Sequence, residues 1–262
     1  MVRAVTFLLA ALCFLCSCND SVKDLQRYQL RGDVGHVEVR SDDGQQFNAF
    51  FGRSGMLDSV IRFSPNDTLR HIYIYDRKGL LEEIQVLHTD GSYEALYEYE
   101  YQKGILSSYT ISGIDMQVLY RWDFEIQDGK AVGCRTYNEG VPVSMVKYSY
   151  DSLDKTETVF TPEGELLSKT TYRYAAPGMI SSIEGDGFGI SIVYNDENLP
   201  VRSLGAFIGP DGEIYSNEVS REYGTIGYEY VMDAEGNWTE RTEVLGEAKA
   251  KGTTIRRKII YR

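Results

Sequence analysis

A tyrosine-rich unit that returns along the chain constrains the fold more than any other feature. Each copy places a Tyr-x-Tyr sequence, or a close variant, before a polar turn that contains Gly or Asn. The copies begin at Tyr73, Tyr99, Tyr120, Tyr148, Tyr172, Tyr194 and Tyr228. The chain has 20 tyrosines and 25 glycines but only 6 prolines. Since tyrosine favours strands and glycine favours turns, the repeat predicts many short strands.

A second set of turns lies between these copies, so each unit contains two strands and two turns. These turns are Thr89-Asp90-Gly91, Asn138-Glu139-Gly140, Pro162-Glu163-Gly164, Gly185-Asp186-Gly187 and Pro210-Asp211-Gly212. Residues 83–88 and 190–194 alternate apolar with polar side chains, which indicates half-buried strands. We predict an all-β antiparallel meander of hairpins, forming an elongated or curled open sheet. Residues 19–30 either form a short helix or stay extended.

The repeat also predicts a stripe of aromatic rings. The two rings of Tyr-x-Tyr share a face, because strand side chains alternate, and equivalent rings two strands apart are roughly 9–10 Å from each other. We take Tyr101, Trp122, Tyr150 and Tyr174 as candidate binding residues on one face. If exposed, such rings stack on sugars or dock a protein. If buried, they pack across strands and stabilise the sheet.

The Tyr-x-Tyr-Asp-x-x-Gly-x-Leu units resemble the YD repeats of the RHS (rearrangement hotspot) type and, more loosely, MORN-type hairpin repeats. The opening residues 30–39 and the closing residues 233–241 and 254–261 resemble a group of uncharacterised repeat-bearing bacterial lipoproteins. Together these resemblances extend from about Leu30 to the end of the chain. They imply a hairpin-repeat fold, and they transfer no activity.

The N-terminus resembles a lipoprotein signal. Arg3 precedes a near-apolar run over residues 4–16, and Leu15-Cys16-Ser17-Cys18 resembles a lipobox. The run is shorter than the about 20 residues that span a bilayer, which favours a cleaved signal. The alternative is an ordinary secretory signal. We therefore divide the chain into a signal peptide (1–17), a tether acylated on Cys18 (18–29) and a single repeat domain (30–262).

Net charge excludes one class of partner. The full chain has a net charge of −12, and removal of residues 1–17 takes away Arg3 and leaves −13. Such an acidic protein repels nucleic acid, whose phosphates bind basic groups. The acidic surface is also not attracted to anionic lipid. We therefore expect the acyl chains on Cys18 to attach the protein to the membrane. Cys134 is the one other cysteine of the mature chain and reads as a small buried residue.

Signatures of catalysis and cofactor binding are weak. His36, His71 and His88 have no metal-ligand spacing, and residues 185–189 lack the Lys and helix of a phosphate loop. The acidic turn over residues 233–237 lacks the spaced ligands of a calcium loop. The sequence leaves open whether two carboxylates lie close together in space, as they do in glycoside hydrolases. We predict no enzyme activity, no cofactor and no metal.

The expected function follows from these points. We expect a lipoprotein of the bacterial cell envelope, at the outer membrane in a Gram-negative cell, whose repeat surface binds a protein or glycan without catalysis. One alternative is a hydrolase with its site in a concave face of the sheet. Another is a purely structural module.

Overall fold

The computed structural model describes residues 24–209, 211–215, 224–246 and 249–262 of the chain. Cys18 and the proposed signal peptide lie outside the described residues. Within the described part, no helix is both long and apolar enough to cross a membrane.

Antiparallel strands form almost the whole of the described chain, as the repeat predicts. One helical turn, α2 (Asp24–Arg27), precedes them. The strands are β1 (Val34–Ser41), β2 (Gln46–Phe51), β3 (Leu57–Phe63), β4 (Thr68–Tyr75), β5 (Leu81–Leu87), β6 (Tyr93–Gln102), β7 (Ile105–Ser112), β8 (Val118–Gln127), β9 (Lys130–Asn138), β10 (Val141–Asp151), β11 (Asp154–Phe160), β12 (Leu166–Ala176), β13 (Met179–Gly185), β14 (Phe188–Tyr194), β15 (Pro200–Leu204), β16 (Phe207–Ile208), β17 (Ile214–Tyr215), β18 (Thr225–Met232), β19 (Trp238–Leu245) and β20 (Ala250–Tyr261).

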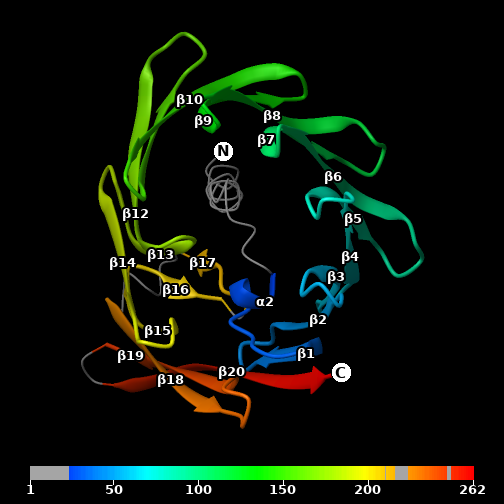
Figure 1. Ribbon diagram of the computed structural model, residues 1–262, viewed down its shortest axis with the longest axis vertical. Coiled ribbons are helices and arrows are strands. Elements are labelled where there is room, and N and C mark those ends of the chain that lie inside the picture. Colours follow the sequence, from blue (N-terminus) through cyan, green and yellow to red (C-terminus); the bar gives the residue numbers. More distant parts are fainter. Residues whose placement is uncertain (1–23, 210, 216–223, 247–248) are drawn as a thin grey trace.

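The sheet closes into an 18-stranded barrel, so the prediction of an open sheet is wrong (Figure 1). Each strand from β1 to β15 pairs with the next, β15 pairs with β18, and β20 returns to β1. The seam joins His36 to Ile260 and Arg40 to Arg256. The opening and closing motifs of the sequence are thus hydrogen-bonded neighbours. Repeat spacing carries no information about this pairing, because it joins residues more than 200 positions apart.

Two kinds of turn connect the strands. Two-residue turns such as Lys103-Gly104 and Asp128-Gly129 have positive φ at both positions, with values of 53° and 81° in the first and 50° and 78° in the second. This is the type I′ geometry, whose twist matches that of the flanking strands.

In the longer turns, a side-chain oxygen accepts hydrogen bonds from backbone N–H groups that have left the strand ladder. Asp76 Oδ1 accepts the backbone N–H groups of Lys78 (2.7 Å) and Leu80 (2.8 Å). Asp233 and Asn195 accept two backbone N–H groups each in the equivalent turns. The polar residue at the start of each of these turns therefore fixes the hairpin connection.

The closed sheet has an inner and an outer face, and the inner face carries the rings of the Tyr-x-Tyr repeats. The α2 helix and the small β16–β17 hairpin lie within the ring in Figure 1. Tyr28, just after α2, packs its ring edge-on against Phe47 (6.2 Å) and Phe51 (5.4 Å) of β2. The backbone N–H of Ile208 in β16 donates to the Tyr228 hydroxyl of β18 (3.0 Å). These contacts identify which side chains point inward, and strand alternation extends the assignment around the barrel.

Contacts at the seam attach the first described residues to the inner wall. The Arg257 guanidinium lies 3.3 Å from the centre of the Trp238 ring and donates to the Tyr28 carbonyl (2.7 Å). Trp238 Nε1 donates to Gln29 Oε1 (2.9 Å). Residues 24–29, the part of the proposed tether that the structure describes, thus pack inside the barrel.

Candidate binding surfaces

The four aromatic residues predicted from the sequence all lie on the inner face, on every second strand. Tyr101 is on β6, Trp122 on β8, Tyr150 on β10 and Tyr174 on β12. Trp122 is buried at 3% exposure, whereas Tyr150 is 38% exposed. The four rings are spread along an arc of this face. Their role in binding stays a prediction.

A more compact aromatic cluster, which the repeat pattern does not predict, is centred on Tyr109 of β7. Its ring centroid lies 4.9 Å from that of Tyr99 and 4.8 Å from that of Trp122. Tyr97 and Tyr120 extend the cluster at 6.2 Å from Tyr109 and 6.1 Å from Trp122. Cross-strand pairing brings these rings together, since Tyr109 opposes Tyr99 on one side and Trp122 on the other. The cluster is a packed part of the wall.

Tyrosine hydroxyls tie neighbouring strands together at one end of the barrel. In each case the last tyrosine of a strand donates to a carbonyl near the start of the strand before it in the sheet. The bonds are Tyr101 to Leu81 O (3.0 Å), Tyr150 to Ala131 O (2.8 Å), Tyr194 to Ile180 O (2.9 Å) and Tyr230 to Pro200 O (2.6 Å). This recurring bond gives the last tyrosine of these strands a structural role.

A buried ion pair lies farther along the inner wall. Lys155 and Glu157 of β11 form a salt bridge and are 2% and 4% exposed. The Lys155 ammonium lies 5.3 Å from the Tyr148 ring centre and 4.7 Å from that of Tyr172, whose hydroxyl donates to Glu157 Oε2 (3.2 Å). The pair was not predicted. The sequence could have indicated the pair, because Lys155 and Glu157 lie four and two residues before the inward-facing Val159 and so share its face of the strand.

A second group of charges attaches the β16–β17 hairpin to the wall. Arg27 of α2 contacts Glu213 (3.2 Å), and Arg62 of β3 contacts Asp211 (3.4 Å). The Tyr215 hydroxyl donates to Asp211 Oδ2 (3.4 Å). Burial raises the pKa of Glu213 to about 7, while Arg27 acts in the opposite direction. Both carboxylates are engaged by arginines, which is the arrangement of a structural contact.

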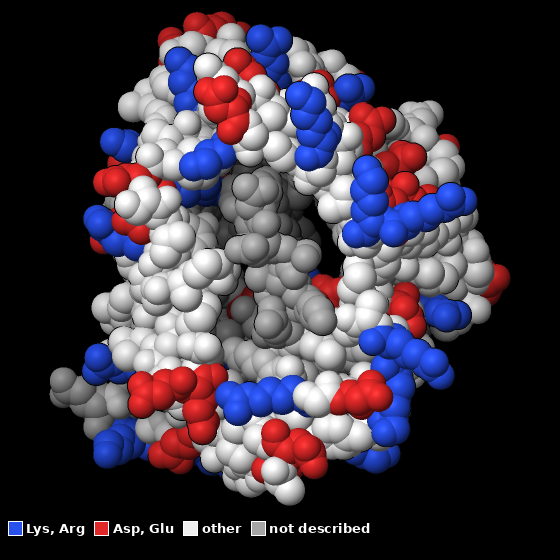
Figure 2. Space-filling model, in the orientation of Figure 1, with Lys and Arg blue, Asp and Glu red and all other residues white. Residues whose placement is uncertain are grey.

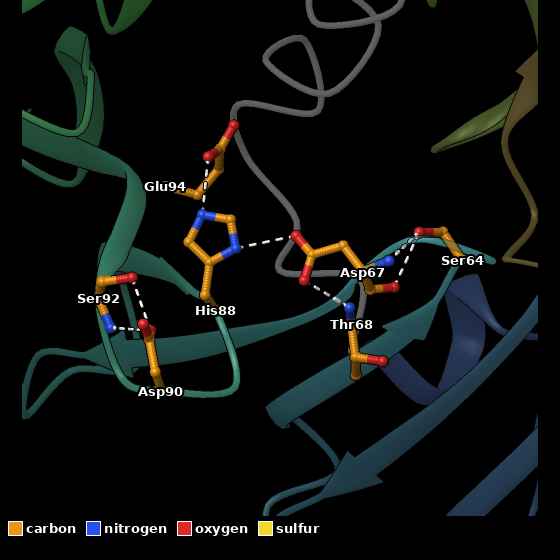
Figure 3. Close-up of polar contacts among 7 residues, drawn as sticks. All are labelled: Ser64, Asp67, Thr68, His88, Asp90, Ser92 and Glu94. Carbon is orange, nitrogen blue, oxygen red and sulfur yellow. Dashed lines mark hydrogen bonds and ion pairs between the residues drawn. The ribbon is translucent and has the colours of Figure 1, made fainter.

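His88 is held between two carboxylates near a barrel rim (Figure 3). Its Nδ1 lies 2.8 Å from Asp67 Oδ2 and its Nε2 lies 3.0 Å from Glu94 Oε2. Asp67 belongs to the turn between β3 and β4, and Glu94 to β6, so the imidazole links two neighbouring hairpins. Desolvation lowers the pKa of His88, but the hydrogen bonds to the two carboxylates outweigh it, and the pKa is raised.

The other two histidines and Cys134 lie in the strands of the wall. His71 faces inward from β4, and His36 stacks on Phe50 with ring centroids 4.8 Å apart. Cys134 is buried on β9. Among residues 24–262, within the ranges that the structure describes, no group of three His, Cys, Asp or Glu side chains could hold a metal ion.

A pocket of about 620 Å³ opens beside the start of β1. Arg53 and Ser54 of the β2–β3 turn line it, together with Asp33 and Arg262. The four predicted aromatic residues do not line it.

Comparisons with known proteins give distant similarities only. No family model and no curated protein matches the chain, so the resemblance to RHS/YD repeats stays with the motifs quoted for it. A solved porin-like protein from Bacteroides uniformis ATCC 8492 is 11% identical, with 87% of this chain and 96% of that chain covered and a TM-score of 0.40.

Two other solved structures show similarity at the same low level. A porin-like protein from Bacteroides vulgatus ATCC 8482 is 12% identical, with 87% and 98% covered and a TM-score of 0.36. The TcdB2-TccC3-Cdc42 structure is 12% identical, with 80% of this chain but only 14% of that chain covered, and a TM-score of 0.29.

Proposed function

We propose that the chain is a non-enzymatic lipoprotein of the bacterial cell envelope, tethered through Cys18, whose barrel stands in water beside the membrane and binds a partner. The observation that carries the proposal is the polarity of the two walls. The rings of the Tyr-x-Tyr repeats face inward together with a few buried charges, such as the paired Lys155 and Glu157, whereas the outward face carries series of exposed ion pairs.

Ion pairs run across the outer face of neighbouring strands. Arg256 of β20 contacts Asp42 (2.6 Å) and Glu240 of β19 (3.1 Å), and Lys258 contacts Glu38 of β1 (3.1 Å). Figure 2, which looks onto one end of the ring, shows acidic and basic side chains interspersed around it.

The same pattern occurs across the barrel from the seam. Arg173 of β12 contacts Glu184 of β13 (3.3 Å), and Arg121 of β8 contacts Asp123 (2.7 Å). A barrel that spans a bilayer carries an apolar outward band, and an Arg or Lys at the bilayer midplane costs roughly 2–4 kcal/mol. The outward charges therefore support a barrel surrounded by water.

A lipid tether at Cys18 would explain how a barrel surrounded by water stays at the membrane after export. Asp24, the first described residue, is anchored to the barrel through Leu57 N–H (2.7 Å) and the Tyr75 hydroxyl (3.0 Å). Residues 18–23 can span at most about 20 Å when extended. The acyl chains would hold this end of the barrel close to the membrane surface.

The hydrolase alternative would have to use Glu213 and Asp211 of the β16–β17 hairpin. Glu213 has a pKa near neutrality and lies close in sequence to Asp211, as a general acid beside a carboxylate would. Turnover of a glycoside by the purified protein that disappears in Glu213→Gln would establish that alternative and refute the non-enzymatic proposal.

The test combines fractionation with cysteine labelling of the full-length protein. Cys18→Ser should move the protein from the membrane to the soluble fraction. In the protein that keeps Cys18, Lys147→Cys and Glu229→Cys place thiols at exposed outward positions on β10 and β18. A membrane-impermeant maleimide should label both equally before and after detergent is added.

A matched inward variant provides the control. Ser144→Cys places a thiol on the inner face of β10, where the serine is 8% exposed, and should react slowly in both conditions. If the outward cysteines react only after detergent, the barrel lies in the bilayer and the proposal fails. If Cys18→Ser stays in the membrane fraction, the tether is wrong.

A further inference from the structure

One rim of the barrel carries exposed aliphatic side chains on three consecutive hairpins. We define this apolar rim by residues in or next to the β7–β8, β9–β10 and β11–β12 turns. They are Ile114, Met116, Val118, Val141, Val143, Leu166 and Leu167, with exposures from 43% to 67%.

The three hairpins are neighbours at the same end of the barrel. Strands β7 to β12 pair in chain order and antiparallel, so alternate turns lie at the same end. Equivalent points two strands apart are roughly 9–10 Å from each other, which makes the apolar rim a continuous arc about 20 Å long. An exposed apolar patch of this kind marks an interaction surface.

Carboxylates accompany the aliphatic groups in each turn. Asp115 lies between Ile114 and Met116, Glu139 precedes Val141, and Glu163 and Glu165 precede Leu166. All four carboxylates are on exposed residues. The rim therefore presents apolar groups alternating with negative charge.

The position of the rim argues against the anchoring membrane as the surface that it contacts. Asp24 contacts the start of β3 and the end of β4, which lie at the opposite end of the barrel from the β7–β8 turn. If the tether of the proposed function is correct, the rim points away from the lipid anchor. Anionic lipid would also be repelled by the carboxylates.

We propose that the apolar rim docks a protein partner through a segment in which aliphatic residues are flanked by Lys or Arg. The partner's aliphatic side chains cover the rim, and its cations pair with the turn carboxylates. Electrostatic complementarity of this kind sets specificity and speeds association. The inference rests on the proposed function only for the direction in which the rim points.

The experiment measures binding of synthetic peptides to the full-length protein in detergent micelles by fluorescence anisotropy. The probe is a peptide of alternating Leu and Lys, and the comparison peptides alternate Leu with Glu and Ser with Lys. We expect the Leu/Lys peptide to bind at least tenfold more tightly than either comparison peptide.

Two sets of substitutions locate the binding. Ile114→Ser with Val141→Ser and Leu166→Ser removes one aliphatic group from each hairpin of the rim. The matched control replaces three exposed aliphatic residues of the outer wall, Val193, Leu204 and Val231, with Ser. The rim variant should weaken Leu/Lys binding at least tenfold, and the control variant less than twofold.

A third variant tests the charges. Asp115→Asn with Glu139→Gln and Glu163→Gln should weaken the same binding at least threefold, and added salt should abolish the difference. Equal binding to the rim and control variants would overturn the proposal. So would equal affinity for the Leu/Glu peptide, rim-dependent binding of anionic phospholipid vesicles, or rim-dependent self-association in sedimentation.

Discussion

The inward tyrosines and tryptophan act first as packing residues. Trp122 illustrates this, since its ring is buried and contacts Tyr109 and Tyr120 on the neighbouring strand and its own. We predict that Trp122→Ala destabilises the protein by about 3–5 kcal/mol, the cost of truncating a large aromatic residue in a core. Tyr150→Ala, at a more exposed position, should cost less. Urea unfolding measures both, and a loss below 1 kcal/mol for Trp122→Ala would contradict the packing role.

Two histidines should give opposite pH dependence. The pKa of His88 is raised in the folded state, so its contribution is present below the unfolded pKa and fades as pH rises through the folded value. We predict that His88→Gln lowers Tm most at pH 5.5 and least at pH 8.5. Melting at both pH values, each against wild type, is the measurement. A pH-independent difference would show that the two carboxylates leave His88 unaffected.

His71 should behave in the opposite way. Burial, assisted by the charge of Arg62, lowers its pKa to about 4. Its stabilising contribution is present above the unfolded pKa of about 6.5 and is lost as pH falls toward 4. We predict that His71→Gln loses less stability than wild type between pH 7 and pH 4.5. Wild type and variant losing equal stability over that interval would refute this.

At the scale of the element, the hairpin is fixed by its turns and by one tyrosine bond. The Tyr194 and Tyr230 hydroxyls each donate to the preceding strand of the sheet, and burial raises the pKa of Tyr194 to about 12. We predict that Tyr194→Phe and Tyr230→Phe each cost about 1 kcal/mol, the net value of one hydrogen bond. Tyr137→Phe on β9 serves as a control. Losses equal to the control in thermal unfolding would contradict the role of the bond.

The sequence allowed the elements to be predicted but left their arrangement open. Turns such as Asp128-Gly129 and Asp233-Ala234-Glu235-Gly236 were recognisable because positive φ and side-chain capping require particular residues there. The shared face of Tyr101 and Tyr150 followed from strand alternation. Alternation cannot say whether that face points in or out, because the answer depends on closure. The α2 contacts and the inward Lys155–Glu157 pair depend on closure in the same way.

At the scale of the whole molecule, closure makes the number of strands matter. A closed, fully antiparallel meander requires an even number, since an odd number would place β1 and β20 parallel. We predict that deleting residues 103–127 removes β7 and β8, lets the Asp128-Gly129 turn replace Lys103-Gly104, and leaves a foldable 16-stranded barrel.

The matched deletion removes one strand. Loss of residues 103–112 takes away β7 alone, leaves 17 strands and should prevent cooperative folding, although fewer residues are lost. Near-ultraviolet circular dichroism and size-exclusion chromatography distinguish the two variants. If the shorter deletion folds as well as the longer one, the seam between β1 and β20 is dispensable.

If the chain is exported as proposed, the seam also sets an order of events during that export. β1 leaves the translocation channel early. The strand that pairs with its other edge, β20, emerges only after more than 200 further residues. Until then the nascent meander has two unpaired edges, which are templates for aggregation of tyrosine-rich strands. We therefore expect the secreted chain to depend on a periplasmic holding chaperone until its last strand is delivered, and to need none once the ring has closed.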